Sequence, residues 1–178
     1  RSHLGGVCLN EGCIPSKALI HAADVAALGG TTHLGVDVHT TVELGKIRAS
    51  IDDVVGGLRN GVGDLLARAG VTVLTGTARF SRPGRVAVED RSMVQHLEFD
   101  RCVVATGSRA VDLTGIDNDD PRVLDAAGAL GLRSLPRTMV VVGGGYIGVE
   151  LGTAFAKLGT TVTIVEAGPR LLPPIDRR

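Results

Sequence analysis

The chain has 178 residues, of which 44% are hydrophobic and 25 are glycine, a composition typical of a folded α/β protein. Nineteen acidic side chains balance nineteen lysines and arginines, which gives no bulk attraction to nucleic acid or to an anionic membrane. Aromatic side chains make up only 2% of the chain, which argues against a base-stacking surface. No apolar run is long enough to cross a bilayer and no signal sequence opens the chain, so we expect a cytoplasmic protein.

Two helices are predicted in the first part of the chain. Residues 16–28 are rich in alanine, leucine and isoleucine, with Pro15 tolerated in a first turn and Gly29 and Gly30 as a stop. Residues 44–66 carry an apolar stripe at helical spacing, which we expect to face the core. The members of this stripe are Leu44, Ile47, Ile51, Val54, Leu58, Val62 and Leu65. Four glycines weaken the second helix, so packing must stabilise it.

Short β-type runs follow, separated by turn signals at 81–84 and 89–91. The expected strands are 71–74, 77–80, 85–89, 93–98 and 101–105. We expect Cys102, which lies among valines in the last of these strands, to be buried and unreactive. Residues 113–121, rich in aspartate and asparagine, are predicted to form a linker.

A βαβ unit is predicted near the end of the chain. It consists of strand 138–142, helix 146–158 and strand 161–165. The turn after its first strand reads Gly-Gly-Gly-Tyr-Ile-Gly, a G-x-G-x-x-G pattern at the point where a strand becomes a helix. Gly143 would permit the tight turn, Gly145 would let a pyrophosphate approach the backbone, and Gly148 would let helix and strand pack closely. The free N–H groups at the helix start would then face the phosphates.

A carboxylate, Glu166, follows the second strand of this unit, 18 residues after Gly148. A carboxylate at that place accepts hydrogen bonds from ribose hydroxyls and repels a 2′-phosphate, which favours NAD over NADP. The alternative, a glycine turn with a purely structural role, leaves Glu166 unexplained. The sequence therefore predicts dinucleotide binding.

Two of the three cysteines, Cys8 and Cys13, lie five positions apart. They could be structural thiols, half of a metal site, or a redox disulfide. Zinc prefers four ligands, and the remaining candidate ligands His21, His33, His39 and His96 are scattered. A helix that starts near Pro15 would direct its positive end at Cys13, and Lys17 would add a cation, so a thiolate there would be suited to disulfide exchange. Such a disulfide exchanges electrons with a nicotinamide through a mediator, which is usually a flavin.

These motifs resemble a known family. Residues 5–19, with the sequence Gly-Gly-Val-Cys-Leu-Asn-Glu-Gly-Cys-Ile-Pro-Ser-Lys-Ala-Leu, resemble the redox-active stretch of the dihydrolipoyl dehydrogenases. Those enzymes are flavin-containing pyridine nucleotide–disulfide oxidoreductases of the 2-oxo acid dehydrogenase and glycine cleavage complexes. Residues 103–108 resemble the ATG segment of the family, and 139–166 resemble its NAD-binding half. Leu9 and Ile14 differ from the valines that glutathione and mercuric reductases favour at these positions.

The resemblance implies a role for each matching residue. Cys8 would be the interchange thiol that meets dihydrolipoamide, and Cys13 the thiol that lies against the flavin. Lys17 would lie near the reactive nitrogen of the flavin and pair with Glu150. The implied FAD contacts include Ala78, Thr106, Gly107 and Ser108, and the implied NAD site consists of Gly143, Gly144, Gly145, Tyr146, Ile147, Gly148, Glu150 and Glu166. No metal site is implied.

The implied fold is α/β, an FAD/NAD(P)-binding Rossmann-like (three-layer ββα) fold that is incomplete, with a redox-active cysteine helix and an antiparallel β insertion. Residues 1–117 would form a partial FAD-binding domain with the redox-active disulfide, and residues 118–178 the first βαβ unit of an NAD-binding domain. Electrons would pass from dihydrolipoamide through Cys8–Cys13 and FAD to NAD⁺. The substrate would be carried by a lipoyl-bearing acyltransferase or glycine cleavage carrier protein, and the parent would be a homodimer with no nucleic-acid or membrane partner.

Two alternatives stay open: another flavin disulfide reductase of the mercuric or glutathione reductase type, and a truncated, non-catalytic nucleotide-binding module. The family carries an earlier G-x-G-x-x-G that grips FAD, and a His–Glu acid/base pair on a C-terminal dimer-forming domain. Because no counterpart of either is found in the 178 residues, we expect an internal fragment that is inactive alone. The sequence does not identify the multienzyme complex that the parent serves.

Overall fold

The protein is described by a computed structural model that covers residues 3–33 and 35–172. In chain order the elements are α1 (Gly6–Glu11), α2 (Cys13–Ala26), β1 (Thr32–His33), β2 (Val36–Asp37), α3 (Leu44–Arg68), β3 (Thr77–Arg82), β4 (Arg85–Glu89), β5 (Val94–Glu98), α4 (Ala126–Leu130), β6 (Thr138–Val142), α5 (Tyr146–Lys157) and β7 (Thr161–Val165). The α/β class, the antiparallel insertion and the βαβ unit agree with the prediction. Helices α1 and α4 and the short β1–β2 hairpin were not anticipated, and the end of the tail, 173–178, lies outside the described residues.

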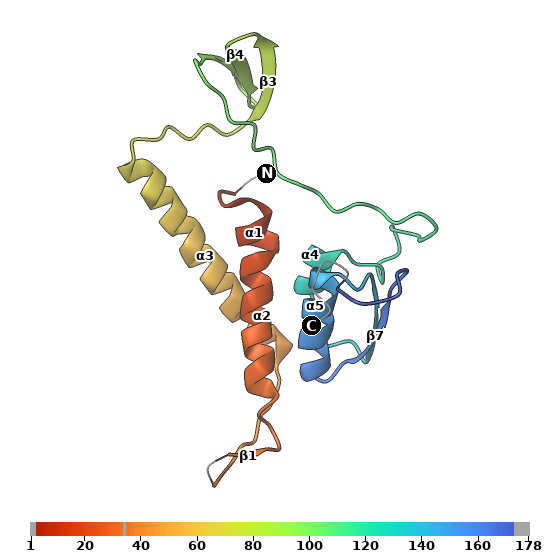
Figure 1. Cartoon of the computed structure of the whole chain (residues 1–178). Coiled ribbons are helices and arrows are strands. Elements are labelled where there is room, and N and C mark those ends of the chain that lie inside the picture. Colours follow the sequence, from red (N-terminus) through yellow and green to blue (C-terminus); the bar gives the residue numbers. More distant parts are fainter. Residues whose placement is uncertain (1–2, 34, 173–178) are drawn as a thin grey trace.

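The core lies among the helices, with α2 between α3 and α5 (Figure 1). Its buried apolar side chains are Leu9, Leu19, Ala23, Leu44, Ile51, Val55, Leu130, Leu151, Ala154, Phe155 and Leu158. Helix α2 begins at Cys13, three residues before the predicted start, and Pro15 is buried in its first turn. Proline is acceptable there because the N–H groups of a first turn have no intrahelical acceptor.

The predicted apolar stripe of α3 is only half correct. Leu44 and Ile51 are buried, but Val54, Leu58 and Leu65 are 47%, 45% and 62% exposed. Val55, which the predicted stripe did not include, is 6% exposed, and Val62 packs against the core. The buried face of α3 is therefore turned relative to the predicted stripe. Periodicity shows which face of a helix is apolar, and it does not show how much of that face a partner covers.

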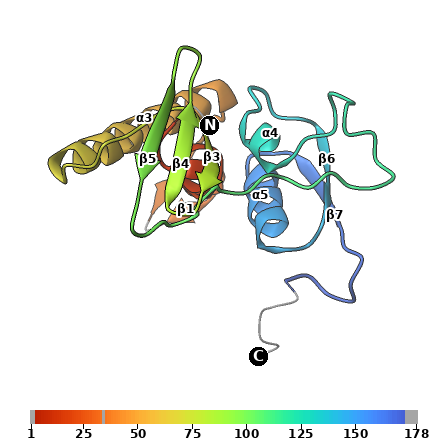
Figure 2. The same ribbon diagram turned by 90° about the horizontal axis from the view of Figure 1, so that it is seen from above.

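Strands β3, β4 and β5 form an antiparallel meander that contacts no helix of the described chain (Figures 1 and 2). The strands predicted at 71–74 and 101–105 flank this meander and are not strands in the structure. Val71, Val103 and Val104 are 48%, 89% and 67% exposed, and Cys102 is exposed rather than buried. These segments have the side chains of buried strands, but a strand forms only where a neighbouring strand supplies hydrogen-bond partners.

The βαβ unit has the bounds that its pattern predicted, except that α5 ends one residue earlier. Strands β6 and β7 are parallel, with Thr138 opposite Thr161 and Val142 opposite Val165. Helix α5 packs on this pair of strands (Figure 2) and its Phe155 is 1% exposed. This parallel strand–helix–strand unit with a glycine turn is the Rossmann-like element of the fold.

Candidate active site

Two helices that meet at one glycine bring the thiols of Cys8 and Cys13 together. Helix α1 follows a turn at Gly5 and Gly6, whose φ angles of 96° and 62° suit glycine. It ends at Gly12, and α2 begins at the next residue, Cys13. Both thiols are exposed to solvent. The five-residue spacing therefore places one thiol on each side of a break between helices.

The two thiols are hydrogen-bonded to one another. This hydrogen bond to Cys13 is the main reason why the pKa of the Cys8 thiol lies above its usual value, with partial desolvation and the charge of Cys13 as further causes. The backbone N–H of Cys13 and the ammonium of Lys17 act in the opposite direction. Two exposed thiols in direct interaction are suited to forming and breaking a disulfide by thiol–disulfide exchange.

Lys17 connects the cysteine helix to the helix of the βαβ unit. Its Nζ donates to Oε2 of Glu150 in α5 at 2.7 Å, so the ion pair implied by the resemblance is present. The two side chains are 59% and 35% exposed, and exposed pairs stabilise a fold only weakly. The pair places a cation one turn after Cys13 and an anion in the first turns of α5.

The glycine loop between β6 and α5 has the geometry of a phosphate-binding turn. Gly143 has a φ of 106°. A Cβ on Gly148 would lie 2.2 Å from the backbone oxygen of Gly143, whereas a Cβ on Gly145 would meet nothing within 4 Å. The first N–H groups of α5 have no intrahelical acceptor. The close packing at Gly148 and the open space at Gly145 suit a pyrophosphate at the start of α5.

The carboxylate of Glu166 binds the backbone of this loop. Its Oε2 accepts a hydrogen bond from the N–H of Gly144 at 2.6 Å, and its Oε1 accepts one from the N–H of Gly168 at 2.8 Å. These two backbone bonds hold the pKa of the carboxyl below its usual value. Sequence reasoning assigned this carboxylate to a ribose and missed its bond to the loop. The signal was its position at the end of the strand beside the glycine turn.

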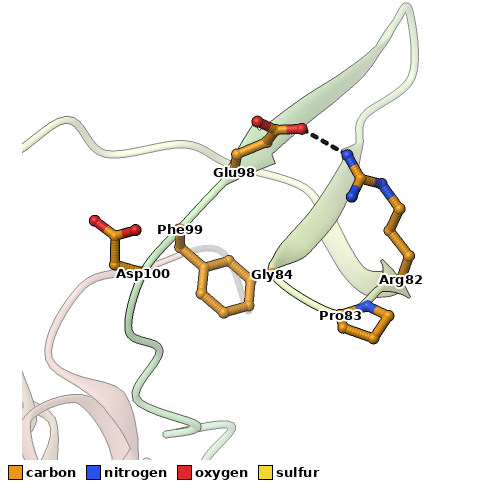
Figure 3. Close-up of a pocket in the computed structure, with 6 residues that line it drawn as sticks. All are labelled: Arg82, Pro83, Gly84, Glu98, Phe99 and Asp100. Atoms are coloured by element: carbon orange, nitrogen blue, oxygen red, sulfur yellow. Dashed lines mark hydrogen bonds and ion pairs between the residues drawn. The ribbon is translucent and has the colours of Figure 1, made fainter.

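The residues that the resemblance assigns to FAD are not gathered at the thiols. Ala78 lies in β3, which contacts no helix of the described chain. Thr106, Gly107 and Ser108 are exposed in the connection after β5. A hollow at the end of the meander, shown in Figure 3, contains none of these residues; it is lined by Arg82, Pro83, Gly84, Glu98, Phe99 and Asp100. The described residues thus fit a pyridine nucleotide, and by themselves they do not form a flavin cavity.

Asn10 lies between the two cysteines, and sequence reasoning did not single it out. Its Oδ1 accepts hydrogen bonds from Nε and Nη2 of Arg59 in α3 at 2.9 and 2.7 Å. The pattern held no local signal for this contact, since the two residues are 49 positions apart.

Within the described ranges, no cluster of metal-ligating side chains is found, and no helix has the length and apolar character to cross a membrane.

Comparisons with known proteins agree with this geometry. Dihydrolipoyl dehydrogenase 3 of Haloarcula marismortui is 39% identical over 99% of the chain, and dihydrolipoyl dehydrogenase of Bacillus subtilis is 41% identical over all of it. The chain spans 38% of the length of each of these relatives. Among solved structures, the HOCl-induced flavoprotein disulfide reductase RclA from Escherichia coli is 31% identical with a TM-score of 0.82, over 99% of this chain and 37% of that one. LpdA from Mycobacterium tuberculosis is 28% identical with a TM-score of 0.85, over 97% and 39%.

FAD and NAD(P) are the cofactors of the family to which these relatives belong, as the resemblance implied. Residues 2–178 match the sequence family described as pyridine nucleotide-disulphide oxidoreductase. The match covers both the cysteine pair and the glycine loop. The chain therefore belongs to the pyridine nucleotide-disulphide oxidoreductase family.

Proposed function

We propose that the chain is part of a dihydrolipoyl dehydrogenase and supplies its redox-active thiols and its first NAD-binding unit. The net reaction converts dihydrolipoamide and NAD⁺ into lipoamide, NADH and one proton. Residues 1–117 would belong to the FAD-binding domain and residues 118–178 to the NAD-binding domain. The observation that carries this proposal is the hydrogen-bonded pair of exposed thiols, Cys8 and Cys13, connected through Lys17 and Glu150 to the helix of the glycine loop.

The thiol step follows from this arrangement. A thiolate of dihydrolipoamide attacks Cys8 in the oxidised pair, and the Cys8–Cys13 bond breaks with Cys13 leaving as thiolate. The N-terminus of α2 and the ammonium of Lys17 favour a negative charge there. The second substrate thiol then attacks the substrate sulfur of the mixed disulfide, which releases lipoamide and Cys8. Cys8 takes up a proton, in keeping with its raised pKa.

The loop and Glu150 have supporting roles in this proposal. Gly143, Gly144, Gly145 and Gly148, with the first N–H groups of α5, would hold the pyrophosphate of NAD. Tyr146 and Ile147, which are 68% and 46% exposed beside the loop, would flank the nucleotide. Glu166 keeps the loop closed and places negative charge where NADP would carry its 2′-phosphate, so NAD is favoured. Bound NAD⁺ accepts a hydride, and the whole enzyme would hold the flavin that supplies it.

The substrate and setting are part of the same proposal. Dihydrolipoamide would arrive on a lipoyl-bearing acyltransferase or glycine cleavage carrier protein, in the cytoplasm, and the parent enzyme would be a homodimer. A second candidate is a flavin disulfide reductase with another substrate. It is favoured by the 31% identity and the TM-score of 0.82 to the flavoprotein disulfide reductase from Escherichia coli. The two candidates share the thiol chemistry and differ in the disulfide that they exchange with.

An exchange assay tests the proposal. The reduced chain is mixed with oxidised lipoamide, and we expect the loss of two thiols, a Cys8–Cys13 disulfide in the peptide map and release of dihydrolipoamide. Cys8→Ser and Cys13→Ser should abolish the product, and Cys102→Ser, at the third exposed thiol, is the matched control that should keep it. A chain whose Cys8 and Cys13 stay reduced contradicts the proposal. Faster exchange with oxidised glutathione than with lipoamide favours the second candidate.

The same preparation tests the cofactor assignment. We expect the 178-residue chain, purified alone, to carry no stoichiometric flavin and to have no NADH–lipoamide activity. The reason is that Ala78 and 106–108 lie in exposed segments away from the thiols. Visible flavin absorbance at one equivalent per chain would contradict this expectation and leave the thiol assay unaffected.

A further inference from the structure

The side chain of Asn10 connects three segments around the thiol pair. Its Nδ2 donates to the backbone oxygens of Leu4 and Gly6 at 2.9 and 2.8 Å. Its Oδ1 accepts two hydrogen bonds from the guanidinium of Arg59 in α3. Both ends of the amide are therefore engaged, since an amide oxygen has two lone pairs and an amide nitrogen two hydrogens. The result is a link from the long helix α3 to the short helix that carries Cys8.

Helix α1 needs such a link. It has six residues and no side-chain cap at its N-terminus, and helices this short are unstable unless other parts of the protein hold them. Leu9 is its buried residue. Gly5 before it and Gly6, its first residue, have positive φ angles, and glycines leave the chain conformationally free when unfolded. Cys8 lies on this helix, whereas Cys13 lies on the 14-residue helix α2.

We propose that Arg59 is a positioning residue for the redox pair. Its two hydrogen bonds to Asn10 hold α1 in place, so that Cys8 stays against Cys13. This inference rests on the proposed function, because it concerns the same thiols. It does not make Arg59 a catalytic residue, since Arg59 contacts Asn10 and neither sulfur. The hydrogen bonds of Arg59 involve a charged donor, which makes them stronger than bonds between neutral groups.

The consequence is a change in the thiol–disulfide equilibrium of the chain. In the oxidised form the disulfide itself holds α1 against α2. In the reduced form no covalent bond joins the two cysteines, and packing and non-covalent bonds, the Asn10–Arg59 bonds among them, hold α1. Loss of the Asn10–Arg59 bonds therefore loosens α1 mainly in the reduced form. Forming the disulfide must then remove the freedom that α1 has gained. The effective concentration of Cys8 at Cys13 therefore falls when Arg59 is removed.

The test is a redox titration of the full 178-residue chain in glutathione buffers, with Cys102→Ser as the common background so that only two thiols titrate. For Arg59→Ala we expect the equilibrium constant for the Cys8–Cys13 disulfide to fall about tenfold, because both charge-assisted hydrogen bonds to Asn10 are lost and part of their effect reaches the thiols. Arg59→Lys keeps the charge but cannot make the two hydrogen bonds of the guanidinium to Asn10, and it should lower the equilibrium constant by a similar factor. Asn10→Ala should match Arg59→Ala, and the double variant should show little additional loss.

The matched control is Arg68→Ala, on the same helix, because Arg68 donates within α3 to the backbone oxygen of Asp64. This control should leave the equilibrium constant unchanged. A variant that only weakens the fold lowers the stability of both redox forms and does not move this constant. If Arg59→Ala does not fold, Arg59→Lys and Asn10→Ala carry the test. Unchanged constants in the folded variants, or a normal constant for Arg59→Lys, would overturn the inference. A background chain that forms no Cys8–Cys13 disulfide would instead overturn the proposed function.

Discussion

The glycine loop was predicted from a specific motif and the segments assigned to FAD from the resemblance, and the two differ in the structure. The loop at Gly143–Gly148 is built within one βαβ unit: β6 pairs with β7, α5 packs on both, and Glu166 binds Gly144. Ala78 lies in a meander that contacts no helix of the described chain, and 106–108 are exposed. The loop, which is made of neighbouring segments, is therefore packed within the chain, whereas the segments assigned to FAD are exposed or outside the helical core.

The cysteine pair belongs with the loop in this comparison. Cys8 and Cys13 are separated by a helix break, and the local backbone geometry there brings them close to one another. Their connection to the nucleotide unit needs α2 and α5 to pack together, which the buried side chains of Ala23, Ala154 and Phe155 allow. The helices that carry the thiols and the helix that follows the loop therefore share one packed core, whereas the meander lies outside it.

The largest effect expected from this difference concerns two phenylalanines. Phe155 is 1% exposed in the core, and Phe155→Ala should lower the free energy of unfolding of the chain by about 3–5 kcal/mol. Phe80, 61% exposed in the meander, contacts Phe99 with ring centroids 6.1 Å apart, and Phe80→Ala should lose about 1 kcal/mol or less. Urea unfolding measures both values. Equal losses would show that the meander is packed as firmly as the helical core.

A smaller effect is expected within the loop itself. Gly148→Ala places a Cβ against the backbone oxygen of Gly143 and should lower the unfolding free energy by about 1–3 kcal/mol. Gly145→Ala enters open space, so it should leave stability almost unchanged and weaken NADH binding, measured by fluorescence titration. Normal NADH binding by a stable Gly145→Ala chain would contradict the pyrophosphate assignment.

The smallest effect is a pH dependence at Glu166. Two backbone N–H groups lower the pKa of this carboxyl from its ordinary value of 4.5, so its ionised form stabilises the folded chain. That contribution is complete above pH 4.5 and is lost as the pH falls through the lower folded value. Glu166→Gln should therefore be less stable than the parent chain at neutral pH, and the difference should shrink under acid conditions. Thermal unfolding across this range gives the measurement, and a pH-independent difference would exclude the ionised hydrogen bonds as its cause.

Several features could be predicted from the sequence because their causes are local. The bounds of β6 and β7, the start of α5 and the tight turn at Gly143 follow from residue types within 28 positions of one another. The Lys17–Glu150 pair spans 133 positions, and it was anticipated only through the resemblance. The Asn10–Arg59 link had no counterpart in any motif, and the bond from Glu166 to Gly144 was missed because the motif assigned that carboxylate to a ribose.

The errors have one physical origin. Val71, Cys102 and Val103 lie in segments with the composition of buried strands, and they are exposed because no neighbouring strand pairs with them. Val54, Leu58 and Leu65 widen the apolar face of α3, but the core covers only the part of that face with Ile51 and Val55. The composition of a segment indicates whether its side chains favour burial. It does not indicate whether another part of the chain covers them.

The amino-acid sequence alone determined the family, the two motifs and the elements whose hydrogen bonds close within a few tens of residues. The tertiary structure alone decided which of these elements share a core: it placed the thiol helices against α3 and α5, turned Glu166 toward the loop and left the meander outside. The physical reason is that local hydrogen bonds depend on nearby residues, whereas burial depends on which distant surfaces meet.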